Sequence, residues 1–292
     1  MTKMLIAAAV LSLMAPDPTG GVGIDMRNVH LRVAADAALD INWLHGTLRP
    51  TRPGQIPVFD DPSSFDMAIE DAELSIDAAS LTALVNHAFA FKGSNLSDLT
   101  VSFEGPYIVQ HGKLSKGVTV PFTVTASVSV TPEGLLRIHP EKMKTAGVPA
   151  SGLMHLFGIE LDNLVHQNPA RGIRIEKDDL LLDSGKMLPP PATSGHLVGA
   201  AVRDNHLMQT FGRGAALRPK SGGNYIWFRG GTIRFGKLTM SDADLQLIDQ
   251  QQADPFDFYS AKYDAQLVAG YSKNTPQHGL RTYMPDYRRV GR

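Results

Sequence analysis

Apolar and polar residues alternate along most of the chain, as they do in strands that bury one face. In residues 24–43 the alternating apolar members are Ile24, Met26, Val29, Leu31, Val33, Leu39, Ile41 and Trp43. The same period of two returns within residues 99–130, 135–138, 172–182 and 198–248, with turns rich in Gly and Pro between the runs. Because such turns join neighbouring strands, the pattern predicts a mostly β protein with antiparallel ladders.

Two segments have the three- and four-residue apolar spacing of amphipathic helices. Asp77 is a plausible N-cap for the first, which is expected to end near Lys92 and Gly93. Its apolar stripe consists of Leu81, Leu84, Val85, Ala88 and Phe89. Ser151 caps the second predicted helix, residues 153–165, whose apolar residues are Leu153, Leu156, Phe157, Leu161, Leu164 and Val165.

Composition excludes several classes of protein. The 292 residues are 43% hydrophobic and 20% charged, so the chain can bury a core and is not expected to be disordered. The net charge of -1 provides no general attraction to nucleic acid, which we exclude as a partner. The absence of cysteine removes disulfides, thiolate metal sites and thiol nucleophiles.

The first fifteen residues have the pattern of a secretory signal peptide. Lys3 precedes the apolar run 4–15, which is too short to cross the roughly 30 Å of membrane hydrocarbon as a helix. We therefore predict an exported protein of the periplasm or cell envelope. Leu13 and Pro16 depart from a favourable cleavage site after Ala15, so whether the segment is removed stays open.

No motif predicts a catalytic residue, a metal ligand or a cofactor. Residues 231–237 have the glycine and lysine spacing of a phosphate loop, but Leu238 stands where a Ser or Thr would bind magnesium. Their alternation predicts a hairpin that turns at Gly236 and Lys237. The aspartates within residues 242–257 lack the calcium-loop pattern and are interpreted as a solvated acidic turn. A Ser-His-Asp triad assembled in space remains an alternative, since sequence order does not define one.

The apolar helix faces are the candidate binding site. Together with one face of the sheet they predict an apolar groove that either packs as a dry core or admits an acyl chain. The predicted lining residues are Leu81, Leu84, Val85, Phe89, Leu153, Leu156, Phe157, Leu161 and Leu164.

Basic residues gather in the last twenty positions, which are interpreted as a mobile tail. An alternative is contact with anionic lipid headgroups, to which each basic residue near the surface contributes about 1 kcal/mol. The candidates for this contact are Arg281, Arg288, Arg289 and Arg292.

The order of these elements resembles a known family. The segment 77–86 (DAASLTALVN), the strands 99–130 and 135–139 and the apolar second helix resemble bacterial LmeA-like envelope proteins of the tubular lipid-binding superfamily. They are also similar in pattern to the β-groove modules of AsmA-type envelope proteins. The resemblance covers residues 24–211, and the β-rich residues after Gly212 depart from it.

This resemblance implies an α+β, mostly β fold in which a long curled antiparallel sheet wraps around one or two amphipathic helices. Together with the residue patterns, it gives an expected organisation of a signal peptide at 1–15, a lipid-groove domain at 23–211, an additional β region at 212–272 and a basic mobile tail at 273–292. The implied function is binding or transfer of phospholipids or other acyl lipids without a cofactor. The alternatives are a phospholipase-like hydrolase and a scaffold domain with a dry core.

Overall fold

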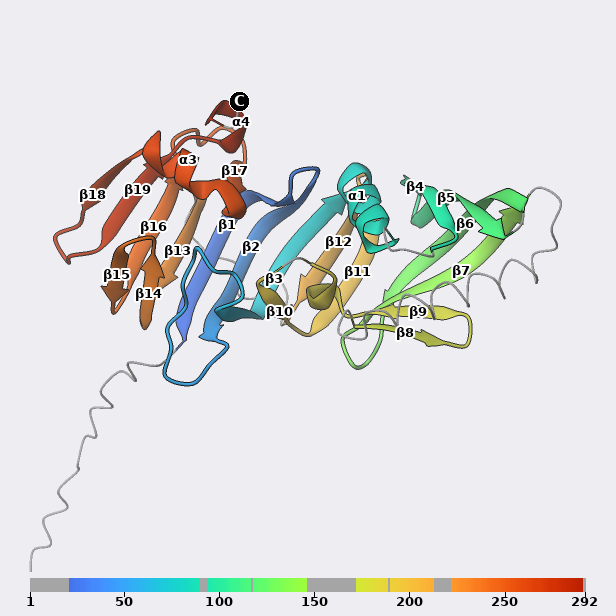
Figure 1. The fold of residues 1–292 in the computed structure, drawn as a ribbon, viewed down its shortest axis with the longest axis horizontal. Coiled ribbons are helices and arrows are strands. Elements are labelled where there is room, and N and C mark those ends of the chain that lie inside the picture. The colour runs from blue at the N-terminus through green and yellow to red at the C-terminus, as the bar shows by residue number, and fades with distance from the viewer. Residues whose placement is uncertain are drawn as a thin grey trace, which may run out of the picture.

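Strands account for most of the described chain (Figure 1). The computed structural model describes residues 21–89, 94–116, 118–145, 172–188, 190–212 and 222–290. These residues form three flat sheets of eleven, six and two strands with a few short helices. The prediction of one long curled sheet wrapped around one or two helices is therefore wrong, whereas the mostly β composition agrees with the alternating pattern.

The large sheet has the strand order β11-β12-β3-β2-β1-β13-β16-β19-β18, with β10 paired to β3 and β17 paired to β1. Its strands are β1 (Val22–Ala34), β2 (Ala37–Pro50), β3 (Phe65–Asp77), β10 (Ala192–Ser194), β11 (Leu197–Arg203), β12 (His206–Phe211), β13 (Tyr225–Arg229), β16 (Asp244–Asp249), β17 (Phe256–Tyr259), β18 (Tyr271–Asn274) and β19 (Leu280–Met284). Most neighbours are antiparallel, but β10, β17 and β19 pair in parallel with β3, β1 and β16.

The small sheet has the order β4-β5-β6-β7-β9-β8 and is entirely antiparallel. Its strands are β4 (Leu96–Glu104), β5 (Tyr107–Lys116), β6 (Val118–Val130), β7 (Leu136–Thr145), β8 (Ile173–Glu176) and β9 (Asp179–Leu182). The third sheet is the hairpin of β14 (Thr232–Phe235) and β15 (Leu238–Ser241). The described helical segments are α1 (Ala78–Phe89), η2 (Ser184–Met187), η4 (Ser260–Lys262), α3 (Tyr263–Val268) and α4 (Tyr287–Val290).

Helix α1 explains why the strands divide into two sheets. It follows β3 directly and lies along β4, the outer strand of the small sheet (Figure 1). The hydroxyl of Thr82 accepts a hydrogen bond from the Val101 N–H at 2.8 Å, and Asn86 Nδ2 donates to the Leu99 carbonyl at 2.7 Å. These side chains occupy backbone groups that another strand would otherwise use, so β4 ends its sheet instead of extending the large one.

The strands near the C-terminus return to the beginning of the chain. β13 pairs with β1, β16 pairs with β13, and β19 pairs with β16. Thr282 and Met284 of β19 are buried. Residues 273–290, where the sequence predicts a basic mobile tail, thus include a strand inside the large sheet and a short helix.

An aromatic cluster attaches the two-stranded hairpin to the large sheet. Phe59 stacks on Phe235 with ring centroids 4.5 Å apart and meets Tyr263 edge to face at 4.9 Å. The loop that carries Phe59 hydrogen-bonds to β14, from the Phe59 N–H to the Arg234 carbonyl at 2.8 Å and from the Arg234 N–H to the Pro57 carbonyl at 3.0 Å. Apolar burial and backbone pairing therefore hold the loop 51–64 and the hairpin together.

Two local predictions are confirmed. α1 starts after Asp77, whose Oδ1 accepts the Ser80 N–H at 2.7 Å as an N-cap does. The hairpin of β14 and β15 pairs Phe235 with Leu238, so its turn is at Gly236 and Lys237 as expected. The predicted second helix, residues 153–165, lies outside the described residues.

Candidate functional site

A cavity of about 450 Å³ lies between α1, the large sheet and the small sheet. Its walls are mostly aliphatic, and the small sheet contributes more of the lining residues than the large sheet or α1 does. The described lining side chains with apolar character include Leu39, Ile69, Leu74, Ile76, Leu207 and Phe211 from the large sheet, and Val101, Ile108, Val124, Ala126, Leu136, Ile138, Met143, Ile173, Leu180 and Leu182 from the small sheet. Its volume falls in the range of small-molecule sites, about 300–1,000 Å³.

Helix α1 contributes the wall that the sequence singles out. Leu81, Leu84, Val85 and Phe89 all line the cavity, and each is partly buried. The other predicted lining residues, Leu153, Leu156, Phe157, Leu161 and Leu164, lie outside the described residues. The helical spacing of apolar residues in α1 thus predicted one wall of the cavity. No pattern in the sequence singled out the residues of the two sheets that line the other walls.

One end of the cavity is polar and reaches the surface. The turn between β8 and β9 contributes Lys177 and Asp178, which are exposed, and Asp179, which is partly buried. Asp179 lies 2.6 Å from both Arg137 Nε and His139 Nδ1. Burial opposes the charge of Asp179, but the hydrogen bonds to His139 and Arg137 hold its pKa below the ordinary value. This end can accept a charged group while the rest of the cavity accepts hydrocarbon.

Two residues of the cavity lining also carry a buried polar atom. Gln209 Oε1 and Ser184 Oγ have no hydrogen-bond partner in the described part of the chain. The sequence analysis missed both. Gln209 carries a signal that could have found it, because it stands between Leu207 and Phe211 in the inward phase of β12, where an apolar residue is expected.

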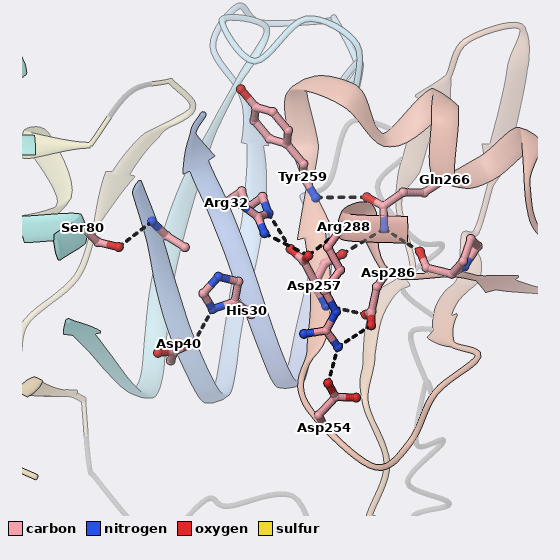
Figure 2. A network of polar contacts seen from close by, with 12 residues as sticks. His30, Arg32, Asp40, Ser80, Asp254, Asp257, Tyr259, Gln266, Asp286 and Arg288 are labelled. Atoms are coloured by element: carbon pink, nitrogen blue, oxygen red, sulfur yellow. Dashed lines mark hydrogen bonds and ion pairs between the residues drawn. The ribbon is translucent and has the colours of Figure 1, made fainter. Parts of the chain in front are cut away.

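A second polar cluster lies where β17 and α4 meet β1 (Figure 2). Asp257 is 2% exposed and accepts hydrogen bonds from Arg32 at 2.6 and 3.0 Å and from the Arg288 N–H at 3.0 Å. Asp286, fully buried, accepts the Asp257 N–H at 2.9 Å and a bond from the Arg288 side chain at 2.7 Å. Arg288 also contacts Asp254. Because protein groups satisfy these charges, the cluster joins α4 and β17 to β1 and is not an open site.

The aspartates of residues 242–257 differ from the predicted solvated turn. Asp249 and Asp257 are each only 2% exposed. Burial raises the pKa of Asp249 despite its hydrogen bond from Asn224 at 3.0 Å. Asp244 accepts hydrogen bonds from Arg281 and Trp227, which lower its pKa. Most of this acidic run therefore supports the fold.

The predicted membrane-contact arginines lie in different environments. Arg281 is 20% exposed and bonds both oxygens of Asp244, at 2.8 and 3.1 Å. Arg288 belongs to the cluster around Asp257. Arg289 is exposed, and Arg292 lies outside the described residues. Two of the four guanidinium groups thus already have carboxylate partners in the fold.

Other candidate chemistry is sparse in the part of the chain that the structure describes. There, no group of three or more His, Asp or Glu side chains could hold a metal ion. No helix among these residues has the length and apolar character to cross a membrane.

The chain was compared with known proteins in three ways. Neither the protein-family models, nor the curated proteins, nor the solved structures include a match to it. The cavity and its chemistry are therefore the basis for assigning a function.

Proposed function

We propose that the protein binds an acyl lipid in the cavity beside α1 and acts in the cell envelope as a lipid-binding or lipid-transfer protein. The observation that carries the proposal is the aliphatic lining of a cavity of about 450 Å³. Such a wall offers hydrocarbon contact and few polar partners, which suits an acyl chain better than a sugar, nucleotide or peptide.

The polar end of the cavity supports a lipid with a headgroup. Lys177 and Asp178 are exposed at the β8–β9 turn, so a headgroup there would remain hydrated while its chain lies against α1. Each buried methylene contributes about 0.8 kcal/mol, so ten of them supply about 8 kcal/mol before ordering costs. A dissociation constant in the micromolar range corresponds to a binding free energy of about 8.2 kcal/mol. The gross contribution of the chain is therefore of the size that such binding requires.

Native mass spectrometry of protein purified without detergent tests the proposal. The expected spectrum shows a stoichiometric adduct that solvent extraction identifies as an acyl lipid. A mass equal to that of the polypeptide alone, after purification from envelope extract, would contradict lipid binding and favour a dry-core scaffold. Assays on phospholipid substrates address the hydrolase alternative separately.

Filling the cavity from two walls makes the test specific. Ala126→Trp enlarges a buried side chain on β6, and Leu84→Trp enlarges a partly buried side chain on α1. Each should reduce bound lipid by about tenfold or more, which corresponds to ~1.4 kcal/mol. Ala261→Trp, at an exposed position in η4, is the matched control and should retain wild-type lipid. Retention of wild-type lipid by both folded cavity variants would place any ligand elsewhere.

A further inference from the structure

A surface hollow of about 410 Å³ lies on the small sheet and is separate from the cavity beside α1. Strands β5, β6 and β7 supply basic and hydroxyl side chains to it, among them His111, Lys113, Thr123 and Lys144. Val124, the neighbour of Thr123, lines the cavity. Because successive side chains of a strand point to opposite faces, the hollow and the cavity lie on opposite faces of the small sheet.

Three polar side chains stand in one row across these strands. His111 pairs with Thr123 in the register of β5 and β6, and Thr123 pairs with Lys144 in the register of β6 and β7. Directly paired residues project to the same face, so the imidazole and the ammonium group flank the Thr123 hydroxyl at one strand spacing, about 4.8 Å, on each side. A small ligand over Thr123 therefore lies within reach of all three side chains.

The charges at the hollow are unbalanced. Among its described lining residues, Lys113 and Lys144 face a single carboxylate, that of Asp98, whose Oδ2 lies 2.7 Å from Lys113 Nζ. Lys144 is exposed, and no hydrogen bond or ion pair within the described ranges occupies its ammonium group. Charged neighbours on adjacent strands normally have opposite signs, so this arrangement leaves one cation available to an anionic ligand.

The neutral members of the row add a hydrogen-bond donor. His111 Nδ1 lies 2.9 Å from Thr123 Oγ1. When Nδ1 carries the proton, it donates to the hydroxyl, which is then free to donate its own proton to a ligand. When Nδ1 is unprotonated, it accepts from the hydroxyl, and Nε2–H is the free donor. The pair thus keeps one donor in either neutral tautomer.

We infer that this hollow binds a phosphate group, with Lys144 as its cation and the pair of Thr123 and His111 as its hydrogen-bond donor. Phosphate oxygens are strong acceptors that form charge-assisted hydrogen bonds with an ammonium group. The phosphate belongs either to a lipid headgroup or to a soluble phosphate compound. The inference does not depend on the proposed acyl-lipid cavity, which lies on the other face of the sheet.

Titration at constant pH and ionic strength tests the site. Nuclear magnetic resonance follows the imidazole signals of His111 as inorganic phosphate replaces chloride, and the expected result is a saturable shift. Co-sedimentation with phosphatidylcholine vesicles, with and without phosphatidic acid, separates the two sources. Sedimentation that requires phosphatidic acid, together with the phosphate response, assigns the site to a lipid headgroup. A phosphate response without sedimentation assigns it to a soluble compound.

Matched variants distinguish a site from general attraction. Lys144→Gln should weaken phosphate binding by about tenfold, and Thr123→Val, which removes the hydroxyl at constant shape, should weaken it as well. Lys142→Gln is the control, because Lys142 is exposed on the same face of β7 but does not line the hollow. Its effect should be less than about twofold.

The outcomes separate this inference from the proposed function. Absence of a saturable response in the wild type, or equal weakening by Lys142→Gln and Lys144→Gln, would overturn the inference and leave acyl-lipid binding intact. Lys144→Gln should also retain the lipid of the cavity, as measured by native mass spectrometry. Circular dichroism of each variant establishes that the fold is present.

Discussion

At the scale of single residues, stability depends on carboxylates that the fold buries. Asp257 is the clearest case, since both of its oxygens accept hydrogen bonds and only 2% of its surface is exposed. Such a charge is tolerated because its donors, above all Arg32, replace the water it loses. Removing a donor should therefore cost more than removing a surface ion pair.

Arg32→Met tests this expectation. The substitution leaves a buried carboxylate without its guanidinium, so the free energy of unfolding should fall by about 3 kcal/mol. Chemical denaturation measures the change. Arg27→Met, on the same strand and with only a 3.5 Å contact to a carbonyl in an exposed setting, should change stability little. A loss below about 1 kcal/mol for Arg32→Met would contradict the role assigned to the pair.

His30 should make stability depend on pH. Its Nδ1 lies 2.6 Å from Asp40 Oδ1, and this hydrogen bond raises the pKa of His30 although burial opposes it. The folded state then holds the proton more tightly than the unfolded chain, whose histidine pKa is about 6.5. The contribution is complete below that value and disappears as the pH rises through the folded-state pKa.

The predicted size of the His30 effect is under about 1 kcal/mol, since solvent screens a pair this exposed. Denaturation of the wild type and of His30→Gln between pH 5 and pH 9 measures it. The stability advantage of the wild type should shrink with increasing pH. An advantage that grows with pH would show that the neutral imidazole is the stabilising form.

At the scale of elements, α1 has two roles. Its apolar stripe lines the cavity, and its polar Thr82 and Asn86 occupy the edge of β4. The helix is short, so packing and capping contribute more to its stability than intrinsic propensity does. Loss of its N-cap should therefore affect the cavity as well as the helix.

Asp77→Ala removes the acceptor of the Ser80 N–H and should lower the free energy of unfolding by about 1 kcal/mol. Lipid retention should fall in the same variant, because the frayed first turn adjoins the cavity wall. Asp66→Ala, an exposed position on the same strand, serves as the control. Unchanged unfolding in Asp77→Ala would exclude a stabilising cap.

At the scale of the whole molecule, the large sheet combines strands that are far apart in the sequence. β1 lies between β2 and β13, and β19 adds the buried Met284 beside β16. The residues after 270 are consequently part of the core and not an appendage.

A chain that ends at Ala269 should fail to fold stably. It lacks β18 and β19 and exposes the apolar edge of β16, including Leu245 and Leu247. The free energy of unfolding should fall by on the order of 5 kcal/mol or more, which is comparable to the total stability of many domains. Thermal unfolding or solubility measures it, with a chain ending at Val290 as the control. An unchanged melting temperature would instead support the mobile-tail interpretation.

Much of the local structure could be predicted because local interactions decide it. The spacing of Leu81, Leu84 and Val85 after a capping Asp77 specifies α1, and alternation around Gly236 and Lys237 specifies the β14–β15 hairpin. These patterns act within a few residues of one another, so they are readable without knowledge of distant partners. They also identified the α1 wall of the cavity.

Only the tertiary structure decided how the strands combine. The pairing of β1 with β13 joins residues about 200 positions apart. The alternation of apolar and polar residues along a strand does not specify which distant strand becomes its partner. The strands also form separate flat sheets instead of one curled sheet, and α1 covers the edge of β4 where the small sheet ends. Likewise, the aspartate at 257 looks solvated in sequence and is buried because Arg32 meets it across the sheet. Local interactions thus specified the elements, and long-range pairing and burial specified their environment, including the buried Oε1 of Gln209, which has no hydrogen-bond partner among the described residues.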